Sequence, residues 1–253
     1  MNWMRKLKKL GCNHTNVSFL RNISGDEINY SGGRRSTWVC DRCGEVILDG
    51  PLFHSPKVFS FDAETDGLWG RPFALSAVVY DSSPIGNTLT QMGQMYSVVK
   101  TGHPAKSFVG YLGPDAVTDG WVRENVLPAL KELEPTHDSY ESMLSDFAAF
   151  YMQHKSEADI IAHIGVPVES QVIEEMHRLG LIGEWDAPFP MIDVGSVLKG
   201  RSENPLSVDE YNARHQTLRN FPEVCGLSPH HPLYDSIAAA AAYYHLLGKK
   251  VRQ

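Results

Sequence analysis

Short apolar runs and longer amphipathic stretches alternate along most of this chain. Apolar runs bounded by turn residues predict strands at 58–63, 72–81, 94–99, 158–163 and 190–194. Helical periodicity predicts helices at 122–133, 140–154, 169–179, near 195–199, and over the alanine-rich segment 233–247. Three strands followed by alternating helices and strands indicate an α/β domain, with a mixed central sheet flanked by helices.

The first fifty residues have a different character. Cys12 and His14 form a close pair, and Cys40 and Cys43 form a second pair after a loop. Two such pairs are the usual way to surround one Zn²⁺ tetrahedrally, and the alternative is a pair of free thiols near a chance histidine. Strand-like pieces are expected at 16–20, 37–40 and 46–48. We therefore expect a zinc-ribbon-like module over residues 1–50 with a basic N-terminal helix, a linker at 51–56, and the main domain over 57–253.

Composition and charge narrow the choice of partners. The chain has 253 residues, 42% of them hydrophobic, and a formal net charge of −7. Residues 1–50 carry eight Lys/Arg and five Asp/Glu, which gives +3 and leaves −10 for the rest. An acidic body argues against nucleic-acid binding by charge alone, but active-site acids offset by bound cations are compatible with a nuclease. With no long apolar stretch and no signal-peptide pattern, we expect no membrane partner and a cytoplasmic location.

Two carboxylates mark the first apolar run of the main domain. Asp62 and Glu64 are separated by one residue at the end of the strand predicted at 58–63. Residues i and i+2 of a strand point to the same face, so these acids are expected to project side by side from a buried strand. Like charges in such a place are costly unless a cation holds them, and carboxylate oxygens suit Mg²⁺.

Three segments in order along the chain carry a family resemblance. The first is Asp62-Ala63-Glu64-Thr65-Asp66-Gly67-Leu68, the second runs from Ile160 to Ile173 with Glu169 opening a helix, and the third is His230-His231-Pro232-Leu233-Tyr234-Asp235. With them the chain resembles the DEDDh branch of the DnaQ-like 3′–5′ exonucleases, over about three quarters of its length. The resemblance implies a ribonuclease H-like fold.

The same resemblance implies roles for particular residues. Asp62, Glu64, Glu169 and Asp235 would hold two Mg²⁺ or Mn²⁺ ions, and His230 would accept a proton from the attacking water. His231 competes with His230 for that role. Glu169 departs from the family pattern, which has Asp at this place. Contacts to substrate are expected from Gly67, Leu68 and Trp69.

Two other residues, Asp193 and Phe73, have two interpretations each, and two more, His163 and Cys225, are expected to have structural roles. Asp193 either supports the site or caps the helix near 195–199. Phe73 either stacks on a base or packs in the core. His163 is expected to be a buried hydrogen-bonding residue at a strand end, and Cys225 a small buried apolar residue.

The expected function is hydrolysis of phosphodiester bonds at the 3′ end of single-stranded DNA or RNA, releasing 5′-mononucleotides by a two-metal mechanism. The alternatives are a catalytically impaired nucleic-acid-binding module of the same fold, and a phosphodiesterase of short oligonucleotides or cyclic nucleotides. The choice between DNA and RNA and the oligomeric state stay open. The Zn²⁺ would be structural, and Arg34, Arg35 and Arg42 offer the N-terminal module a nucleic-acid surface as one of two interpretations.

Overall fold

The structure is a computed structural model that describes residues 17–23, 35–48, 57–81 and 106–251. Cys12, His14, the linker at 51–56 and the strand expected at 94–99 lie outside the described residues. Within these ranges, no helix combines the length and the apolar character that crossing a membrane requires.

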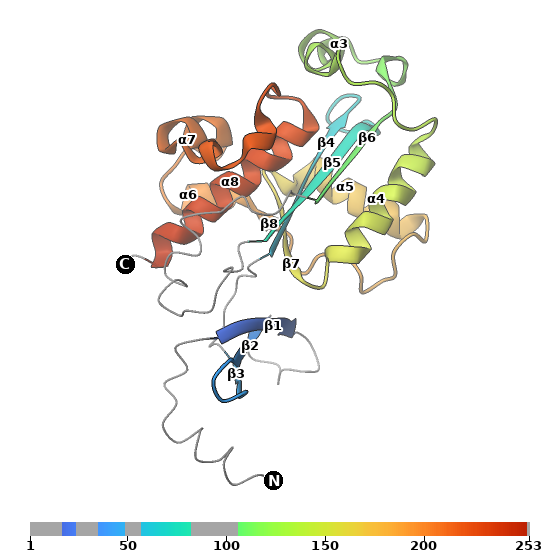
Figure 1. Ribbon diagram of the computed structural model, residues 1–253. Coiled ribbons are helices and arrows are strands. Elements are labelled where there is room, and N and C mark those ends of the chain that lie inside the picture. Colours follow the sequence, from blue (N-terminus) through green and yellow to red (C-terminus); the bar gives the residue numbers. More distant parts are fainter. Residues whose placement is uncertain (1–16, 24–34, 49–56, 82–105, 252–253) are drawn as a thin grey trace.

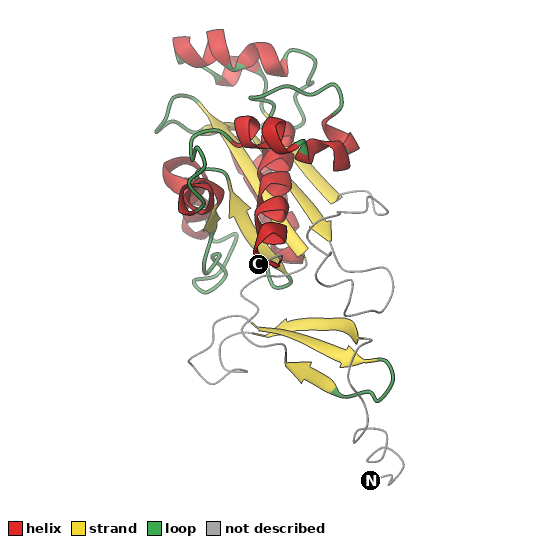
Figure 2. Cartoon of the chain, turned by 90° about the vertical axis from the view of Figure 1, so that its left-hand side faces the viewer, coloured by secondary structure: helices red, strands yellow, loops and turns green. Residues whose placement is uncertain are grey.

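A small antiparallel sheet forms the N-terminal part (Figure 2). Its strands, in the order β1-β2-β3, are β1 (Val17–Ile23), β2 (Arg35–Cys40) and β3 (Val46–Leu48). The three strands predicted in this region are confirmed. Trp38 on the central strand is only 2% exposed, so this short sheet has an apolar side as well as strand pairing.

A five-stranded mixed sheet forms the centre of the main domain (Figure 1). Its strands are β4 (Lys57–Thr65), β5 (Pro72–Asp81), β6 (Lys106–Tyr111), β7 (Ala158–Ala162) and β8 (Ile192–Asp193). The strand order is β6-β5-β4-β7-β8. β4, β5 and β6 pair antiparallel, whereas β7 runs parallel to β4 and to β8. The predicted α/β class with a mixed central sheet is confirmed, although β6 was not among the predicted strands.

Helices cover both faces of this sheet. They are α3 (Gly120–Asn125), α4 (Tyr140–His154), α5 (Ser170–Arg178), α6 (Val194–Gly200), α7 (Val208–His215) and α8 (Pro232–Val251). Short helical turns complete the set: η2 (Pro114–Ala116), η3 (Leu127–Leu130), η4 (Gly165–Glu169), η5 (Thr217–Asn220) and η6 (Pro222–Val224).

One helix prediction was wrong in extent, and one helix was missed. The single helix predicted at 122–133 is instead α3 followed by the turn η3. Pro128 at the start of η3 has no N–H to donate, which ends the helical hydrogen bonding there. α7 was not predicted, because its eight residues carry few apolar side chains and therefore show no clear helical periodicity.

Alternate residues of β4 pack against different helices. Phe59 and Phe61 belong to the core beneath α4 and α5, together with Phe147 and Met176. Val58 belongs to the opposite core, which α6, α7 and α8 cover. By the strand alternation, Ser60, Asp62 and Glu64 share the face of Val58. The expectation that both acids project from one face of a buried strand therefore fits the packing of β4.

Close packing of α8 brings its first turn onto β4 and β5. α8 presents a run of small side chains, and Ala238 to Ala242 are all buried, in the core between the sheet and helices α6 and α7. Near the helix start, the hydroxyl groups of Ser236 and Ser76 lie 2.6 Å apart, and both residues are fully buried. Ser76 is the β5 residue that pairs with Asp62 of β4. Small residues on both elements thus let the helix approach the sheet directly above Asp62.

We predict that Ser236→Val destabilises the protein by about 1–3 kcal/mol, because it forces extra volume into this contact and removes the partner of the Ser76 hydroxyl. The double variant Ser76→Ala/Ser236→Ala removes both hydroxyl groups together and is expected to stay within about 1 kcal/mol of wild type. Urea denaturation followed by circular dichroism measures both. Equal stability of Ser236→Val and wild type would contradict the packing argument.

Candidate metal-dependent active site

Three segments meet at the end of β4. Asp62 and Glu64 lie on β4, His230 and Asp235 flank the start of α8, and Glu169 ends the turn that follows β7. β7 runs parallel to β4, so the two strands end at the same side of the sheet. The order of strands therefore places residues more than 100 positions apart in one region.

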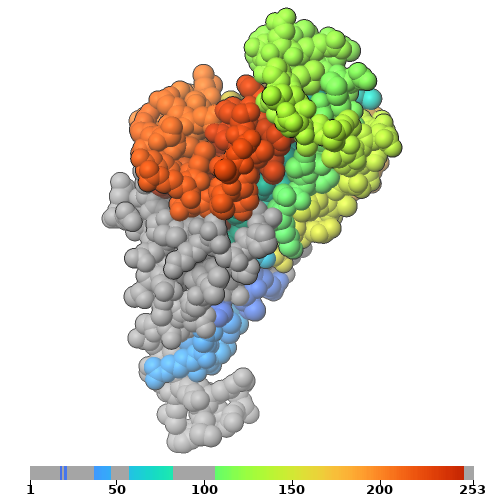
Figure 3. Space-filling view, turned by 45° about the horizontal axis from the view of Figure 1, so that its top comes forward, coloured from blue at the N-terminus to red at the C-terminus, as the bar shows by residue number. Residues whose placement is uncertain are grey.

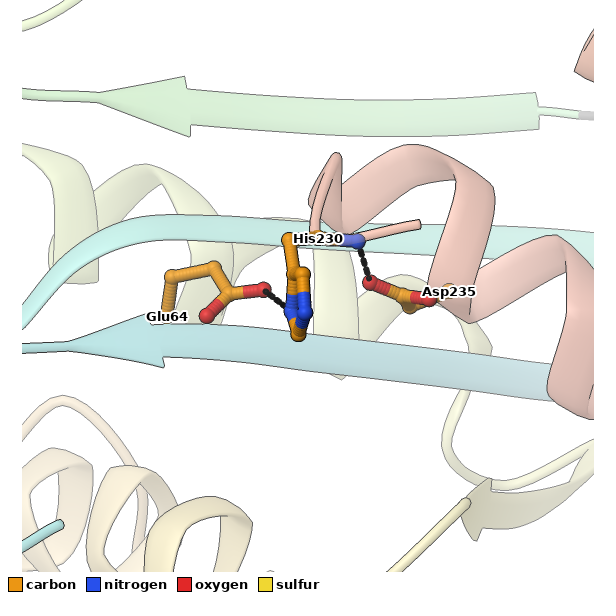
Figure 4. Close-up of side chains that lie close together, drawn as sticks. All are labelled: Glu64, His230 and Asp235. Carbon is orange, nitrogen blue, oxygen red and sulfur yellow. Dashed lines mark hydrogen bonds and ion pairs between the residues drawn. The ribbon is translucent and has the colours of Figure 1, made fainter. Parts of the chain in front are cut away.

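Glu64, His230 and Asp235 form the tightest group (Figure 4). One ligand atom from each lies within 4.8 Å of the others. His230 Nδ1 is 3.8 Å from Glu64 Oε1. The backbone N–H of His230 donates to Asp235 Oδ2 over 2.9 Å. These contacts hold the imidazole between the two carboxylates.

The start of α8 explains why His230 has this position. Pro232 occupies the first helical position, where a missing N–H has no cost. Asp235 lies in the first turn and reaches back to the backbone of His230, which has φ of 68°. His231 precedes the helix, is less exposed than His230, and its Nδ1 has no hydrogen-bond partner within the described part of the chain. The structure thus brings His230 into the group and leaves His231 outside it.

Glu169 is 5% exposed and closes the turn η4. The hydroxyl of Ser170 donates to the carbonyl of Pro167 over 2.8 Å, which tightens this turn. Glu169 Oε2 is buried and has no hydrogen-bond partner among the described residues. The side chain of Glu169 therefore points into the protein interior.

Asp193 caps helix α6, which is one of the two interpretations given to it, and it also binds the turn that carries Glu169. Its Oδ1 accepts from the backbone N–H of Ser196 at the start of α6. Its Oδ2 accepts from the N–H of Gly165 over 2.8 Å, which anchors the turn that carries Glu169. His163 Nε2 lies 3.1 Å from the carbonyl oxygen of Pro205, so the expected hydrogen-bonding role of His163 is confirmed, although this residue is only half-buried.

Burial and mutual repulsion shift the pKa values of the acids upward. Desolvation is the largest cause of the raised pKa of Asp62, followed by the charges of Asp235, Glu64 and Glu169. Desolvation also raises the pKa of Asp235 to about 8, with Glu64 and Asp209 adding to it. Burial raises the pKa of Glu169 to about 8, although hydrogen bonds from its own backbone and that of Ala63 oppose the shift. Asp62, Glu169 and Asp235 therefore resist ionisation as long as no positive charge is present.

The neighbouring carboxylate of Glu64 favours the charged form of the His230 imidazole. It raises the pKa of His230 above its usual value, against the effect of burial. His231 has a lowered pKa because burial disfavours its charged form.

The donor set suits a divalent cation. Asp62 Oδ2 and Glu169 Oε2 are buried polar atoms without hydrogen-bond partners in the described ranges. Buried carboxylate oxygens normally have a partner or coordinate a metal. Carboxylate oxygens from four acids fit Mg²⁺ or Mn²⁺. The residues present thus fit the metal ions that the family resemblance implies.

Next to the acids, the turn from β4 to β5 carries the residues expected to contact substrate. Gly67 has φ of +78°, a conformation that favours glycine. Leu68 is 60% exposed and Trp69 is 75% exposed. Phe73 is 1% exposed, so it packs in the core and does not stack on a base.

The sequence patterns did not indicate a further acid near the site, Asp209, and the burial expected for Cys225 was wrong. Asp209 Oδ1 accepts from the hydroxyl of Tyr234 over 3.0 Å, and its charge raises the pKa of Asp235. Asp209 lies in helix α7, which the sequence pattern did not predict. Its closeness to Asp235 therefore becomes visible only in the tertiary structure. Cys225 is exposed, and its expected burial was wrong because it follows the short turn η6 at the surface.

Two of the four residues expected to bind zinc are described. Cys40 and Cys43 are both buried, at the end of β2 and in the turn that follows. Gly44 has φ of +69°, and its N–H donates to the carbonyl of Cys40 over 2.7 Å. The tight turn expected at Gly44 is confirmed, while Cys12 and His14 lie outside the described ranges.

Comparisons with protein-family models, with curated proteins and with solved structures gave no match to this chain.

We predict that the chelator-treated protein loses stability as the pH rises from about 5 to about 9. An acid whose pKa is higher in the folded than in the unfolded protein stabilises the fold below its unfolded pKa, and this contribution is lost as the pH rises through the folded value. Glu169 and Asp235 set the upper limit of this window, because their pKa values are about 8. Thermal melts in EDTA across this range measure the effect.

The matched control is Glu169→Gln, which removes one titrating group and should flatten the dependence. Addition of Mn²⁺ should flatten it as well. A melting temperature in EDTA that does not change between pH 5 and pH 9 would contradict the crowding of buried acids.

Proposed function

We propose that this protein is a metal-dependent 3′–5′ exonuclease of the DEDDh type, with a ribonuclease H-like domain over residues 57–253. It hydrolyses phosphodiester bonds at the 3′ end of single-stranded nucleic acid and releases 5′-mononucleotides. The order of its three motif segments supports the assignment. So does their meeting at one end of a mixed sheet that helices cover on both faces.

The observation that carries the proposal is the crowding of Glu64, Glu169 and Asp235 around Asp62, with His230 beside Glu64 and Asp235. Asp62 has a buried oxygen without a partner among the described residues, and the charges of Asp235, Glu64 and Glu169 all raise its pKa. Such an arrangement costs stability in the absence of cations, so a structural explanation alone does not account for it. Metal ions that are bound there for catalysis would account for this arrangement of acids.

Asp62, Glu64, Glu169 and Asp235 would hold the two ions. When bound, Mg²⁺ or Mn²⁺ ions supply a nucleophilic water at neutral pH and stabilise the charge that develops on the phosphate oxygens. The burial of Asp62 and Glu169 gives these carboxylates fixed orientations. Glu64 and Asp235 also hold His230 through its side chain and its backbone N–H.

His230 would accept the proton of the attacking water. Its side chain is 50% exposed, so solvent reaches the imidazole, whereas Glu64 beside it is 15% exposed. An imidazole is the side chain whose pKa lies nearest to neutral pH. Glu64 orients the ring, and Asp235 fixes the backbone from which the ring projects.

The N-terminal sheet is proposed to be a zinc ribbon with a structural role. Cys40, Cys43 and the tight turn at Gly44 provide half of a tetrahedral site. Cys12 and His14 would complete it. A sheet of this size buries little apolar surface, so a bound metal would supply much of its stability.

We predict that Asp62→Asn lowers hydrolysis of a 3′ single strand by at least about 10³-fold, because it removes the carboxylate at the centre of the acids. The same change removes one of several repelling charges, so the melting temperature in EDTA should rise. The assay compares single-stranded DNA, single-stranded RNA, a dinucleotide and a cyclic nucleotide in Mg²⁺ and in Mn²⁺. Full turnover by Asp62→Asn on every substrate would refute the site.

We predict about one zinc per chain in protein purified without chelator, and loss of that zinc in Cys43→Ser. Cys225→Ser is the matched control, because Cys225 is exposed and far from the N-terminal sheet in sequence. Inductively coupled plasma mass spectrometry measures the zinc content. Zinc retained at wild-type level in Cys43→Ser would argue against the ribbon.

A further inference from the structure

Three large apolar side chains are exposed beside the acids. Leu68 and Trp69 lie on the turn between β4 and β5, and Trp121 lies in α3, where it is 63% exposed. We call these three residues the tryptophan surface. Large apolar side chains at the surface are costly to solvate when they gather at one place, and such groups often mark binding sites.

The two segments of this surface are hydrogen-bonded to each other. The carboxylate of Asp66 accepts from the backbone N–H of Thr118 over 2.8 Å, from its hydroxyl over 2.6 Å, and from the N–H of Asp119 over 2.7 Å. Asp119 in turn caps α3 through the N–H of Val122. A Cβ atom on Gly67 would lie 3.4 Å from Asp119 Oδ2, so the turn and the helix cap are in contact. Trp69 and Trp121 therefore project from one fixed unit.

This unit adjoins the proposed active site. Asp66 follows Glu64 by two residues, so the turn leaves β4 directly after the acids. In the ribbon, α3 lies beyond the turn that joins β4 to β5 (Figure 1). The space-filling view shows the α3 segment, in green, projecting from the same end of the molecule as the red start of α8 (Figure 3).

The charged residues near the tryptophan surface are either acidic or engaged elsewhere. The guanidinium of Arg71 lies over the Tyr140 ring and 3.8 Å from Glu141. Asp115 and Glu124 are exposed on either side of Trp121 in the sequence. Arg123 is also exposed, but its Nε donates to the carbonyl of Val117 over 2.9 Å and turns back toward the preceding loop. Carboxylates repel phosphates, whereas the flat faces of bases stack on indole rings without regard to sequence.

We propose that the tryptophan surface binds unpaired bases that lie upstream of the 3′-terminal nucleotide. This proposal rests on the proposed function and specifies its substrate: a strand that is single over several nucleotides. Paired bases present their faces to each other within the duplex, so a base-paired end cannot use this surface. Affinity should therefore grow with the length of the single strand until both rings are covered.

The test compares KM on a thymidine 8-mer with KM on the p-nitrophenyl ester of thymidine 5′-monophosphate, which has no upstream base. Trp69→Ala and Trp121→Ala are each expected to raise KM for the 8-mer by about fivefold to 100-fold, the range for losing one stacked base. Trp121→Ala should change neither kcat on the 8-mer nor KM for the ester. Trp121→Phe should restore most of the loss, because a smaller aromatic ring still stacks.

Trp185→Ala is the matched control. Trp185 is 89% exposed, but the adjacent Asp186 contacts Tyr151 and Lys155 at the end of α4, at the opposite end of the sheet from the acids. Its KM values should equal those of wild type. The proposal is overturned if KM for the 8-mer is unchanged in both tryptophan variants, or if Trp121→Ala raises KM equally for the ester.

A binding measurement separates this proposal from the proposed function. Fluorescence anisotropy with a labelled thymidine 8-mer is measured on the full chain in Ca²⁺. If wild type hydrolyses no substrate but binds the 8-mer, and Trp121→Ala binds at least about fivefold more weakly, the surface stands and the exonuclease fails. If all variants bind equally, or if none binds, the surface is refuted whatever the hydrolysis result.

Discussion

Repulsion among buried carboxylates is the constraint on which the rest of this structure depends. Asp62 is surrounded by three other acids, and desolvation adds to their effect on its pKa. A fold that holds these groups together must stabilise itself elsewhere, and here it does so with two apolar cores on either side of the sheet. Functional sites commonly keep such unfavourable local arrangements because the chemistry requires them.

The packing of α8 against the sheet brings His230 and Asp235 close to the acids of β4. A helix with bulky side chains at its start would lie farther from the sheet, and Asp235 would not reach the level of Glu64. The contact between Ser76 and Ser236, and the alanines that follow it, remove this obstacle. Stability and function therefore share one interface, since the same small residues that fill the core set the position of His230 and Asp235.

Hydrogen bonds to acidic side chains fix the segments around the site. Asp193 links the turn before Glu169 to the start of α6, and Asp66 links the β4–β5 turn to the start of α3. Each of these carboxylates accepts from backbone N–H groups that would otherwise lack partners near a helix start. Asp193 and Asp66, which do not belong to the group of Glu64, His230 and Asp235, thus hold the surrounding segments in place. These segments carry Glu169, Trp69 and Trp121.

The sequence by itself determined the elements whose pattern is local. The limits of β5 and α4 agree with the pattern, because each has a continuous periodicity and clear boundary residues. The side-by-side placement of Asp62 and Glu64 follows from the two-residue repeat of a strand. The tertiary structure alone decided what depends on distant contacts: that Glu64, His230 and Asp235 meet, that His231 stays apart, and that Phe73 belongs to the core. It also set the break between α3 and η3, the burial of Glu169 and the exposure of Cys225, because burial depends on what packs against a residue rather than on its neighbours in the chain.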